Sequence, residues 1–494
     1  MRTRSAWVAV SATLVLAGAV ALPAACGSTP AGSSAQSGVS SAALSAPVRL
    51  ATDRSRRSAA VVASGGAAAP YNYAPSVVLD GGSYRMWWCS QLPDVGTPGD
   101  DVLTASSAAL DGPFGQATAA FHGSGTGFDA VHTCDPSVLK VKGTYYLYYT
   151  GSAGDLAHGN AIGLATSQDG ITWQRRGDEP VVVPSLETRR DNAYGVGQPS
   201  ALYLDGWFYL MFTDTTAKAA GWNGAGQFVL RSPDPSFATG TQQLTASGFT
   251  PTPTGRSDGT PRAVSIVDAF SADWMWVDAL DAFAVAHEAD GRGTVVTFWN
   301  RDFTAHPYAE VVLDGPWQEG PGLVRRADGH APASADDPCD RVPVDLVRAV
   351  RQASAPTDLM HFGVDLTGVG GCRSPATLDG FAMPAPDRTV VLVVDGHLVH
   401  VDRRSVADQL AAAVLDTPVD GLDSLPVVAA VSPGAAAVHA PDRPYALLLD
   451  GKLWPVGSAR AVQFNSSPVS EVSDEEWDGM PKGSDLSLFG RGRM

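Results

Sequence analysis

Residues 134–149 read Cys134-Asp-Pro-Ser-Val-Leu-Lys-Val-Lys-Gly-Thr-Tyr-Tyr-Leu-Tyr-Tyr149. This stretch combines an x-Pro-Ser start, an apolar strand, a turn with glycine and a second strand rich in aromatic residues. Tyr73 to Trp88 and Gly197 to Phe212 repeat this pattern. The copies follow one another at intervals of about 60 residues, and proline, which has no N–H, fits best at a strand start. The repeat predicts an all-β fold in which each copy begins one blade of a β-propeller.

Two further blades are predicted after the three copies. The sequence from Asp268 to Ala286, followed by Gly293 to Arg301, is rich in Trp, Val and Phe and indicates a fourth blade. A fifth begins at Gln318 to Gly329, with outer strands expected near 342–350 and 359–366. Five lies within the range of blade numbers that propellers adopt. We therefore predict a five-bladed β-propeller over residues 70–375.

The C-terminal part predicts a small domain of β-hairpin repeats over residues 388–494. Val390 to Val401 and Tyr445 to Val456 each contain two apolar strands joined by Asp-Gly, a strong signal for a two-residue hairpin turn. Asp474 to Met480 predicts a closing helix, with Ser473 as N-cap and Glu476 completing a capping box. These repeats resemble small repeats of secreted bacterial surface proteins, which implies either an interaction role or simple structural packing.

The first residues predict export. Arg2 and Arg4 precede an apolar run from Ala6 to Leu22, and Pro23-Ala-Ala-Cys26 follows as a cleavage site. Residues 1–26 therefore predict a signal peptide that resembles a bacterial lipoprotein signal, with Cys26 as the lipidated residue that anchors the protein to a membrane at the cell surface. Ordinary secretion and a retained anchor are the alternatives. Residues 27–69, rich in Ala, Ser and Gly, predict a flexible tether.

Cysteine usage fits an oxidising compartment. Four cysteines remain beside Cys26, namely Cys89, Cys134, Cys339 and Cys372, and they allow three pairings. Cys89 ends the second strand of one blade and Cys134 begins the first strand of the next. The two strand ends lie on the same face, so we predict the pairs Cys89–Cys134 and Cys339–Cys372. No Cys-x-x-Cys spacing or His cluster indicates a metal, and we predict none.

The overall charge excludes some partners. The 494-residue chain has a formal net charge of −17. Such an acidic chain argues against a nucleic-acid partner and against a surface that binds anionic lipid. The sequence does not predict an oligomeric state or a cofactor.

The blade motifs resemble a known enzyme superfamily. The Asp135-Pro-Ser-Val motif, the aromatic strand that ends at Gly151, Ile162 to Trp173 and Glu319-Gly-Pro look like the five-bladed propeller glycosidases of the arabinanase, β-xylosidase, levansucrase and invertase type. The resemblance covers roughly residues 70–375 and is specific to the superfamily rather than to one activity. It implies a funnel at the propeller axis that holds three acidic residues near the starts of the first three inner strands.

Carried over to this chain, the three acidic positions are Ala74, Asp135 and Gln198. Glycoside hydrolysis needs two carboxyl groups, one kept protonated as the acid and one ionised as the base or nucleophile. Alanine and glutamine supply neither. The sequence therefore favours a carbohydrate-binding protein that lacks efficient hydrolysis, with sugar binding weak and dependent on Asp135.

Relocated carboxylates offer an alternative. Asp214 follows the second strand of the third blade, Asp278 ends the start of the fourth, and Glu319 opens the fifth. We predict Asp135, Asp214 and Glu319 as candidate catalytic residues of an arabinofuranosidase-like or xylosidase-like hydrolase. For each carboxylate, a structural role in a turn or cap is the competing interpretation.

Four further residues are predicted to contact a sugar. Gln198 and His132 offer hydrogen bonds, and Trp88 and Trp274 offer flat rings that suit stacking on a sugar. Packing between blades is the competing interpretation for each Trp, and a structural role for His132. Three classes of function therefore remain: a glycan-binding propeller, a glycoside hydrolase with relocated carboxylates, and a protein-binding scaffold.

Overall fold

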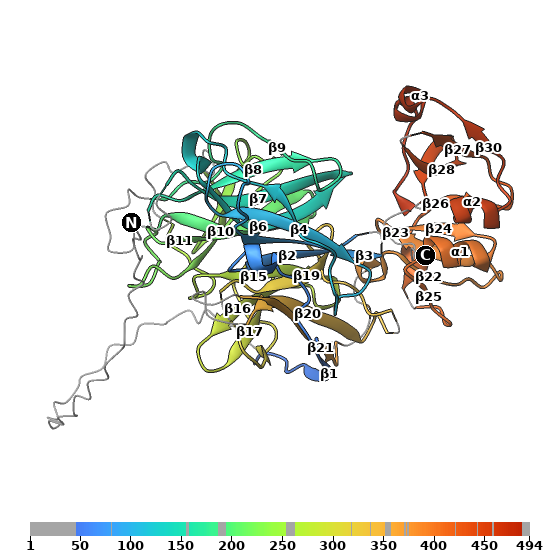
Figure 1. Ribbon diagram of the computed structural model, residues 1–494. Coiled ribbons are helices and arrows are strands. Elements are labelled where there is room, and N and C mark those ends of the chain that lie inside the picture. The colour runs from blue at the N-terminus through green and yellow to red at the C-terminus, as the bar shows by residue number, and fades with distance from the viewer. Residues whose placement is uncertain are drawn as a thin grey trace, which may run out of the picture. The chain divides into compact units, whose positions relative to one another are not determined.

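The computed structural model describes residues 46–486 except 81, 155–157, 186–193, 253–261, 318, 336, 351–356, 370–371, 373–374, 420, 442 and 457–458. The expected signal peptide, Cys26, the first part of the expected tether and Gln318 lie outside the described residues. The regular secondary structure of the described residues consists mainly of β-strands (Figure 1).

The three repeated motifs each start an antiparallel sheet, as the sequence predicts. The first two sheets contain β2 (Tyr73–Asp80), β3 (Ser83–Ser90), β4 (Asp101–Ser107) and β5 (Thr118–Phe121), then β6 (His132–Val141), β7 (Thr144–Ser152), β8 (Ala161–Ser167) and β9 (Gln174–Arg175). The third contains β10 (Val196–Leu204), β11 (Trp207–Asp214), β12 (Gln227–Ser232), β13 (Gln242–Thr245) and β14 (Gly248–Pro251).

Two further groups of strands follow where the sequence indicates them. The fourth contains β15 (Ala272–Val277), β16 (Ala282–Ala289), β17 (Gly293–Trp299) and β18 (Val311–Leu313), and the fifth contains β19 (Gly322–Arg326), β20 (Arg341–Ala349), β21 (Leu359–Thr367) and β1 (Ala51–Arg57). Strand β19 also pairs in parallel with β2, which joins the last group to the first.

Strand β1 departs from the sequence prediction, because it lies within the segment expected to be a flexible tether. It pairs with β21 and so adds an N-terminal strand to the last group. Arg56 Nε donates to Asp345 Oδ1 at 2.8 Å, and its Nη1 donates to Asp365 Oδ1 at 2.5 Å. Six of the seven β1 residues are exposed. The strand is thus held mainly by backbone pairing and ion pairs, and it shows no apolar alternation that sequence reasoning could detect.

The first strands of the five groups contact one another in a closed cycle, β2, β6, β10, β15 and β19, the order of a β-propeller (Figure 1). Ser76 Oγ accepts a hydrogen bond from the Val138 amide at 3.0 Å, and Ser137 Oγ accepts one from the Ala201 amide at 2.9 Å. Ser200 repeats the contact with the Trp274 amide at 3.3 Å. The serine of each x-Pro-Ser motif therefore joins its own sheet to the next one.

Asp273 makes the fourth contact of the cycle in place of a serine. Its Oδ2 accepts a hydrogen bond from the Leu323 amide at 2.7 Å. The parallel pairing of Val324 with Val77 then closes the ring. Apolar clusters fill the space between neighbouring sheets; one of them combines Val78 and Trp87 with Leu147. Burial of such large side chains supplies the main driving force for packing the sheets.

The C-terminal part contains two smaller sheets with short helices. The first has β22 (Phe381–Pro384), β23 (Val390–Val394), β24 (His397–Val401), α1 (Arg404–Leu410), β25 (Ala413–Val414) and β26 (Val427–Val431). The second has β27 (Ala437–Ala440), β28 (Arg443–Leu449), β29 (Lys452–Pro455), α2 (Ala459–Phe464), β30 (Val469–Glu471) and α3 (Asp474–Gly479). The turns of 3₁₀ helix are η1 (Gly66–Ala68), η2 (Gly127–Asp129), η3 (Asp278–Leu280), η4 (Pro375–Leu378) and η5 (Leu422–Ser424).

Local signals in this part are confirmed. Asp395 and Asp450 adopt left-handed φ angles of 50° and 48°, which the two-residue Asp-Gly turns require. Ser473 caps α3 and forms the predicted capping box with Glu476. In the part of the chain that the structure describes, no helix is both long and apolar enough to cross a lipid bilayer.

Candidate active site

Three equivalent residues bend their strands at the starts of β2, β6 and β10. Ala74, Asp135 and Gln198 have φ angles of 46°, 46° and 51°, and the register shifts around each one. Residues other than glycine rarely adopt this left-handed conformation, which is unfavourable by about 1–3 kcal/mol. Such strain persists where the surrounding structure holds a residue in one conformation, and strained residues of this kind are common at functional sites. These are the same three positions that the family resemblance identifies.

Asp135 is a buried carboxyl group with a raised pKa. Its side chain is hydrogen-bonded to the side chains of Thr150 and Tyr194. Burial, followed by the negative charge of Glu319, raises the pKa of Asp135 to about 7, although its two hydrogen bonds act in the opposite direction. Asp135 therefore exchanges a proton near neutral pH, which is the property of a general acid or base.

Glu319 comes from the segment before β19 and reaches the same place. The Gln198 side-chain amide donates a hydrogen bond to Glu319 Oε1. The neighbouring Gly320 has a φ of 75°, and a Cβ there would lie 2.7 Å from the Ala74 Cα. The backbone next to Glu319 thus runs against Ala74. The small side chain at position 74 leaves room for this segment, which brings a carboxylate to the place where Ala74 itself provides none.

The pKa of Glu319 is also raised. Surrounding protein desolvates the carboxyl group, and the hydrogen bond from Gln198 offsets part of the rise. By surface area, however, the Glu319 residue is exposed. Because solvent reaches it, we regard desolvation as weaker at Glu319 than at the 7% exposed Asp135. The charge of Glu319 raises the pKa of Asp135, and because Glu319 is the more exposed of the two groups, we assign the ionised form to Glu319.

Two tyrosines complete the carboxylate cluster, which we define as Tyr73, Asp135, Tyr194, Gln198 and Glu319. Burial and the charges of nearby carboxylates, Asp135 and Glu319 among them, raise the pKa values of both tyrosines well above the ordinary value. Both hydroxyls therefore stay protonated at neutral pH and can donate hydrogen bonds. The cluster contains no arginine or lysine.

The disulfide Cys89–Cys134 lies directly beside the cluster, and both predicted disulfides are confirmed. The Cα atoms of Cys89 and Cys134 are 5.0 Å apart, and those of Cys339 and Cys372 are 4.6 Å apart. The Tyr73 hydroxyl lies 3.1 Å from Cys134 Sγ. Asp100 lies close to both sulfur atoms, a grouping that resembles a metal site. Because both sulfur atoms are in the disulfide bond, they cannot act as thiolate ligands.

Arg325, in β19, contacts the inner strands β10 and β15 close to the cluster. It is 1% exposed, and its Nη1 donates hydrogen bonds to the carbonyl oxygens of Ala201 and Trp274 at 3.0 Å each. Nη1 also lies 3.3 Å from Asp273 Oδ1. Arg325 therefore fixes β19 to β10 and β15, which holds the strand starts that carry Gln198 and Glu319.

Asp214 is not part of the cluster, and its carboxylate is held by buried partners. Its predicted catalytic role therefore needs correction. The residue is fully buried, and its Oδ2 accepts hydrogen bonds from Arg262 and from Ser185 Oγ, at 2.6 Å for Ser185. Its Oδ1 accepts a hydrogen bond from Thr216 Oγ1 at 2.7 Å. These partners give Asp214 the structural role that the sequence left as the alternative.

The predicted contacts of Trp88 and Trp274 with a sugar are also wrong for this structure. Both side chains are 0% exposed. The Trp88 indole N–H donates to Asn72 Oδ1 at 2.8 Å, and Trp274 stacks on Phe283 with ring centroids 5.2 Å apart. Burying a large apolar ring between two sheets is energetically favourable. The aromatic residues of these strands therefore pack inside the protein and are not available to a ligand.

His132 is held by the backbone. Its Nδ1 accepts a hydrogen bond from the Asp100 amide at 3.0 Å, and its Nε2 lies 3.0 Å from the Gly154 carbonyl oxygen. An Nε2–H tautomer satisfies both contacts, which leaves neither nitrogen for a sugar hydroxyl. Gln198, in contrast, contacts Glu319 as described and belongs to the cluster.

The site residues predicted from the sequence included neither Tyr73 nor Tyr194. A signal for Tyr73 was present, because it stands directly before the Ala74-Pro-Ser motif. The link between Tyr194 and Asp135 joins segments 59 positions apart in the printed numbering. It depends on where the fold places Tyr194, and no local pattern marks it.

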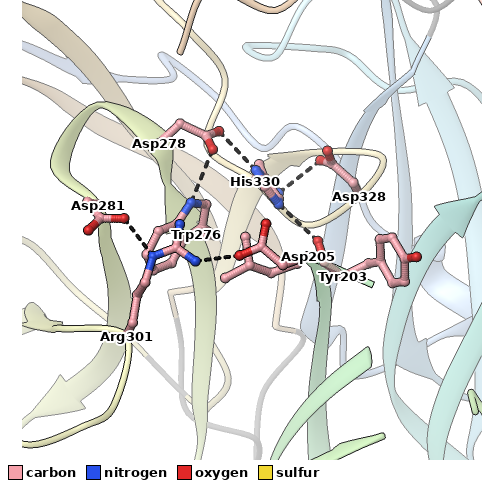
Figure 2. Close-up of a pocket in the computed structure, with 9 residues that line it drawn as sticks. Tyr203, Asp205, Trp276, Asp278, Asp281, Arg301, Asp328 and His330 are labelled. Carbon is pink, nitrogen blue, oxygen red and sulfur yellow. Dashed lines mark hydrogen bonds and ion pairs between the residues drawn. The ribbon is translucent and has the colours of Figure 1, made fainter. Parts of the chain in front are cut away.

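A separate cavity of about 230 Å³ lies at the opposite ends of β10, β15 and β19 (Figure 2). His330 Nδ1 lies 2.9 Å from Asp278 Oδ2, and His330 Nε2 lies 2.9 Å from the Tyr203 carbonyl oxygen. Arg301 stacks over Trp276 at 4.5 Å and donates to Asp281 Oδ1 at 2.7 Å. These charged groups are paired with one another, so we place the candidate chemistry in the carboxylate cluster instead.

Asp278 lies in this second cavity rather than in the cluster. Burial would raise its pKa, but the charge of His330, the hydrogen bond with His330 and the charge of Arg326 hold it below the ordinary value. Asp278 is thus an ionised partner of His330 and is not a candidate acid.

Two related proteins match a part of the chain. No protein-family model matches the chain. Two uncharacterized proteins of Mycobacterium tuberculosis, one from strain CDC 1551 and one from strain H37Rv, are each 30% identical over 106 residues, which is 21% of this chain and 34% of each relative. The matched region thus spans about a third of the length of these relatives.

Solved structures with a similar arrangement include several named as glycoside hydrolases. A family 117 glycoside hydrolase from Zobellia galactanivorans is 14% identical, with 65% of this chain and 92% of that chain covered and a TM-score of 0.45. A family 43 β-xylosidase/α-arabinofuranosidase from a compost microbial metagenome is 14% identical, with coverages of 69% and 99% and a TM-score of 0.40. The catalytic domain of a family 62 α-L-arabinofuranosidase from Coprinopsis cinerea is also 14% identical, with coverages of 64% and 97% and a TM-score of 0.38. Scores below 0.5 at this identity do not by themselves assign an activity to this chain.

Proposed function

We propose that the chain is a five-bladed β-propeller that acts on glycosides, with Asp135 as the general acid and Glu319 as the base or nucleophile. The observation that supports this proposal most is the coupling between the two carboxyl groups. They come from different sheets, and the charge of Glu319 raises the pKa of Asp135. One protonated and one ionised carboxyl group is the combination that glycoside hydrolysis requires.

The division of roles follows from the surroundings of each group. Asp135 is buried and keeps its proton to about pH 7, so it can protonate the oxygen of a leaving group. Glu319 is exposed and accepts a hydrogen bond from Gln198, which favours its ionised form. It can accept a proton from water or attack the sugar carbon directly. Tyr73 and Tyr194 remain protonated and can bind sugar hydroxyls.

We further propose that the protein is exported and anchored through a lipid on Cys26. The signal-like residues 1–26 and the two disulfides support this location, because disulfides persist in oxidising compartments. The sugar, the linkage and the oligomeric state are not assigned.

The test is a panel of aryl and alkyl glycosides, among them α-L-arabinofuranosides and β-D-xylosides, incubated with the full-length protein. We expect Glu319→Gln to reduce kcat for both kinds of leaving group on the order of 10²-fold or more. Asp135→Asn should reduce turnover of alkyl glycosides far more than that of 4-nitrophenyl glycosides, because nitrophenolate leaves without an acid. Glu310→Gln, an exposed carboxylate paired with Arg292, is the matched control and should retain activity.

A second candidate function, glycan binding without hydrolysis, has its own support. Ala74 and Gln198 stand where the resemblance implies carboxyl groups. Binding of a polysaccharide that depends on Asp135, together with no turnover of any glycoside in the panel, would establish this second function. A wild-type protein that neither binds nor hydrolyses any of these carbohydrates would overturn the proposal altogether.

A further inference from the structure

Trp222 is an exposed aromatic residue on the same side of the protein as the carboxylate cluster. Its exposed fraction is 97%, the highest of the exposed large hydrophobic residues that the structure describes. It lies in the connection from β11 to β12. The end of β11 pairs with the start of β10, with Gly197 opposite Thr213, and Gln198 follows directly. The Trp222 connection therefore leaves the sheet at the edge where the cluster lies.

The backbone around Trp222 is fixed although its ring is free of protein contacts. The Gly221 amide donates to the Ala225 carbonyl at 2.8 Å, and the Gly224 amide donates to the Gly221 carbonyl at 2.9 Å. The Ala225 amide also donates to Asn223 Oδ1 at 3.1 Å. A tight hydrogen-bonded turn thus presents the indole to solvent, and little backbone order remains to be lost when a ligand binds.

Phe270 lies between this turn and the cluster. Thr213 Oγ1 lies 3.3 Å from Gln198 Oε1 and is also hydrogen-bonded to the Phe270 carbonyl. The Gly226 amide donates to the Ala269 carbonyl at 3.1 Å, which ties the end of the Trp222 connection to the Phe270 segment. The Phe270 side chain is 36% exposed. Hydrogen bonds therefore connect Gln198, through Thr213, to the segment of Phe270 and then to the connection that carries Trp222.

We infer that Trp222 and Phe270 bind sugar rings beyond the one at the carboxylate cluster, so that the ligand is an oligosaccharide or polysaccharide rather than a single glycoside. This inference rests on the proposed function. Flat apolar rings with a polar edge suit the faces of sugar rings. A ligand that touches both the cluster and Trp222 has to extend over the Phe270 segment, because the Thr213 link between them is buried, and we infer that it has more than one sugar unit.

The charge of the protein favours an uncharged glycan over a membrane at this place. An exposed Trp at the tip of a turn could also enter a lipid interface. The net charge of −17 opposes contact with anionic lipid headgroups, and the connection from β11 to β12 contains a single cationic side chain, Lys218. Neutral sugar rings meet no such repulsion.

The experiment combines affinity electrophoresis in gels that contain soluble arabinan, xylan, mannan or levan with kinetics on the matching 4-nitrophenyl monosaccharides. For whichever polysaccharide retards the wild type, we expect Trp222→Ala to weaken binding about 5- to 10-fold and Phe270→Ala to weaken it less, while Trp222→Phe retains most of the affinity. The monosaccharide substrates should be affected less than 2-fold by these changes, since they end before Trp222. Ile171→Ala removes a 53% exposed apolar residue in the connection from β8 to β9 and is the control.

The possible failures are distinguishable. If the wild type binds or hydrolyses glycans but Trp222→Ala changes neither the polysaccharide nor the monosaccharide result, the inference about Trp222 is wrong while the proposed function stands. Equal losses on both kinds of ligand would also overturn it, because the variant would then have disturbed the cluster. Binding to phosphatidylcholine/phosphatidylglycerol vesicles that is lost in Trp222→Ala, with no polysaccharide binding, would show a membrane contact instead. A wild type without any glycan interaction overturns both proposals.

Discussion

Gln198 donates a hydrogen bond to Glu319 from the strand position that the family resemblance assigns to a carboxylic acid. An amide neither gives nor takes a proton in the working pH range, so Gln198 cannot replace that acid. It acts instead as a fixed donor, which lowers the pKa of Glu319 against the opposing effect of burial. Position 198 thus lacks a carboxyl group, and the amide that stands there favours the ionised form of Glu319.

Removing the Gln198 amide should raise the pKa of Glu319 further. In Gln198→Ala the desolvation of the carboxyl group remains, while the hydrogen bond that favours the ionised form is lost. The pH dependence of activity or ligand binding should then shift so that its acidic limb lies at higher pH. Carboxyl ¹³C NMR titration measures the same change directly. Gln242→Ala, which removes a partner of Arg231 outside the cluster, should leave the Glu319 titration unchanged.

Replacing Asp214 should affect stability and not chemistry alone. The Asp214 and Arg262 side chains are 0% and 5% exposed, and breaking such a buried pair leaves an uncompensated charge. We expect Asp214→Ala to lower the free energy of unfolding by about 3–5 kcal/mol, measured by urea denaturation. Glu310→Ala, in a pair with both side chains 47% exposed, should change it by less than about 1 kcal/mol. A stable but inactive Asp214→Ala protein would restore the catalytic interpretation.

His330 should make part of the stability depend on pH. Burial would lower its pKa, but the charges of Asp328 and Asp278 raise it above the ordinary value. Both ring nitrogens face oxygen acceptors, so the charged form is the one that satisfies both. Its contribution is complete below the pKa of about 6.5 in the unfolded chain and is lost as pH rises through the folded pKa.

The measurement is the thermal midpoint across pH 5 to 9 for the wild type and His330→Gln. We expect the wild type to lose stability on the alkaline side more steeply than the variant. Other groups with raised pKa values, among them Asp135 and Glu288, contribute the same sign in both proteins and cancel in the difference. Identical slopes would mean that His330 is not charged in the folded state.

Gly320→Ala should displace Glu319. Position 320 has a φ of 75°, and an added Cβ would lie 2.7 Å from the Ala74 Cα. Gly206→Ala is a matched control, because Gly206 has a similar φ of 84° but nothing within 4 Å of an added Cβ. In both variants the alanine has to adopt the left-handed conformation, which should lower the free energy of unfolding by about 1–2 kcal/mol. Only Gly320→Ala should also lower the pKa of Asp135, because the charge of Glu319 moves away from it.

Cys26→Ala tests the anchor. If Cys26 carries the lipid, the variant should move from the membrane fraction to the medium, since the substitution removes the residue that would be acylated. Immunoblots of fractionated cells measure the distribution. Unchanged membrane partitioning would reject lipidation at Cys26.

Local sequence patterns determined the sheets and the order in which they follow. The x-Pro-Ser starts, the Gly-containing turns and the Asp-Gly hairpins each depend on residues close together in the chain, as does the capping box at Ser473. The disulfide Cys89–Cys134 was predictable as well, because both cysteines stand at strand ends whose direction the repeat fixes. The position of Asp135 followed from its place in the motif.

Which of the possible carboxylates meet depends on contacts between strands that are distant in the sequence. Glu319 reaches Gln198 because Gly320 packs against Ala74, a contact between the first and last groups of strands that no local pattern contains. Asp214 is no candidate for catalysis because it is paired with Arg262. Trp88 and Trp274 are no candidates for sugar binding because neighbouring sheets bury them. Burial and pairing are properties of the closed ring of strands. A sequence specifies which residues carry charge or aromatic rings, but the fold determines which of them solvent and ligand can reach.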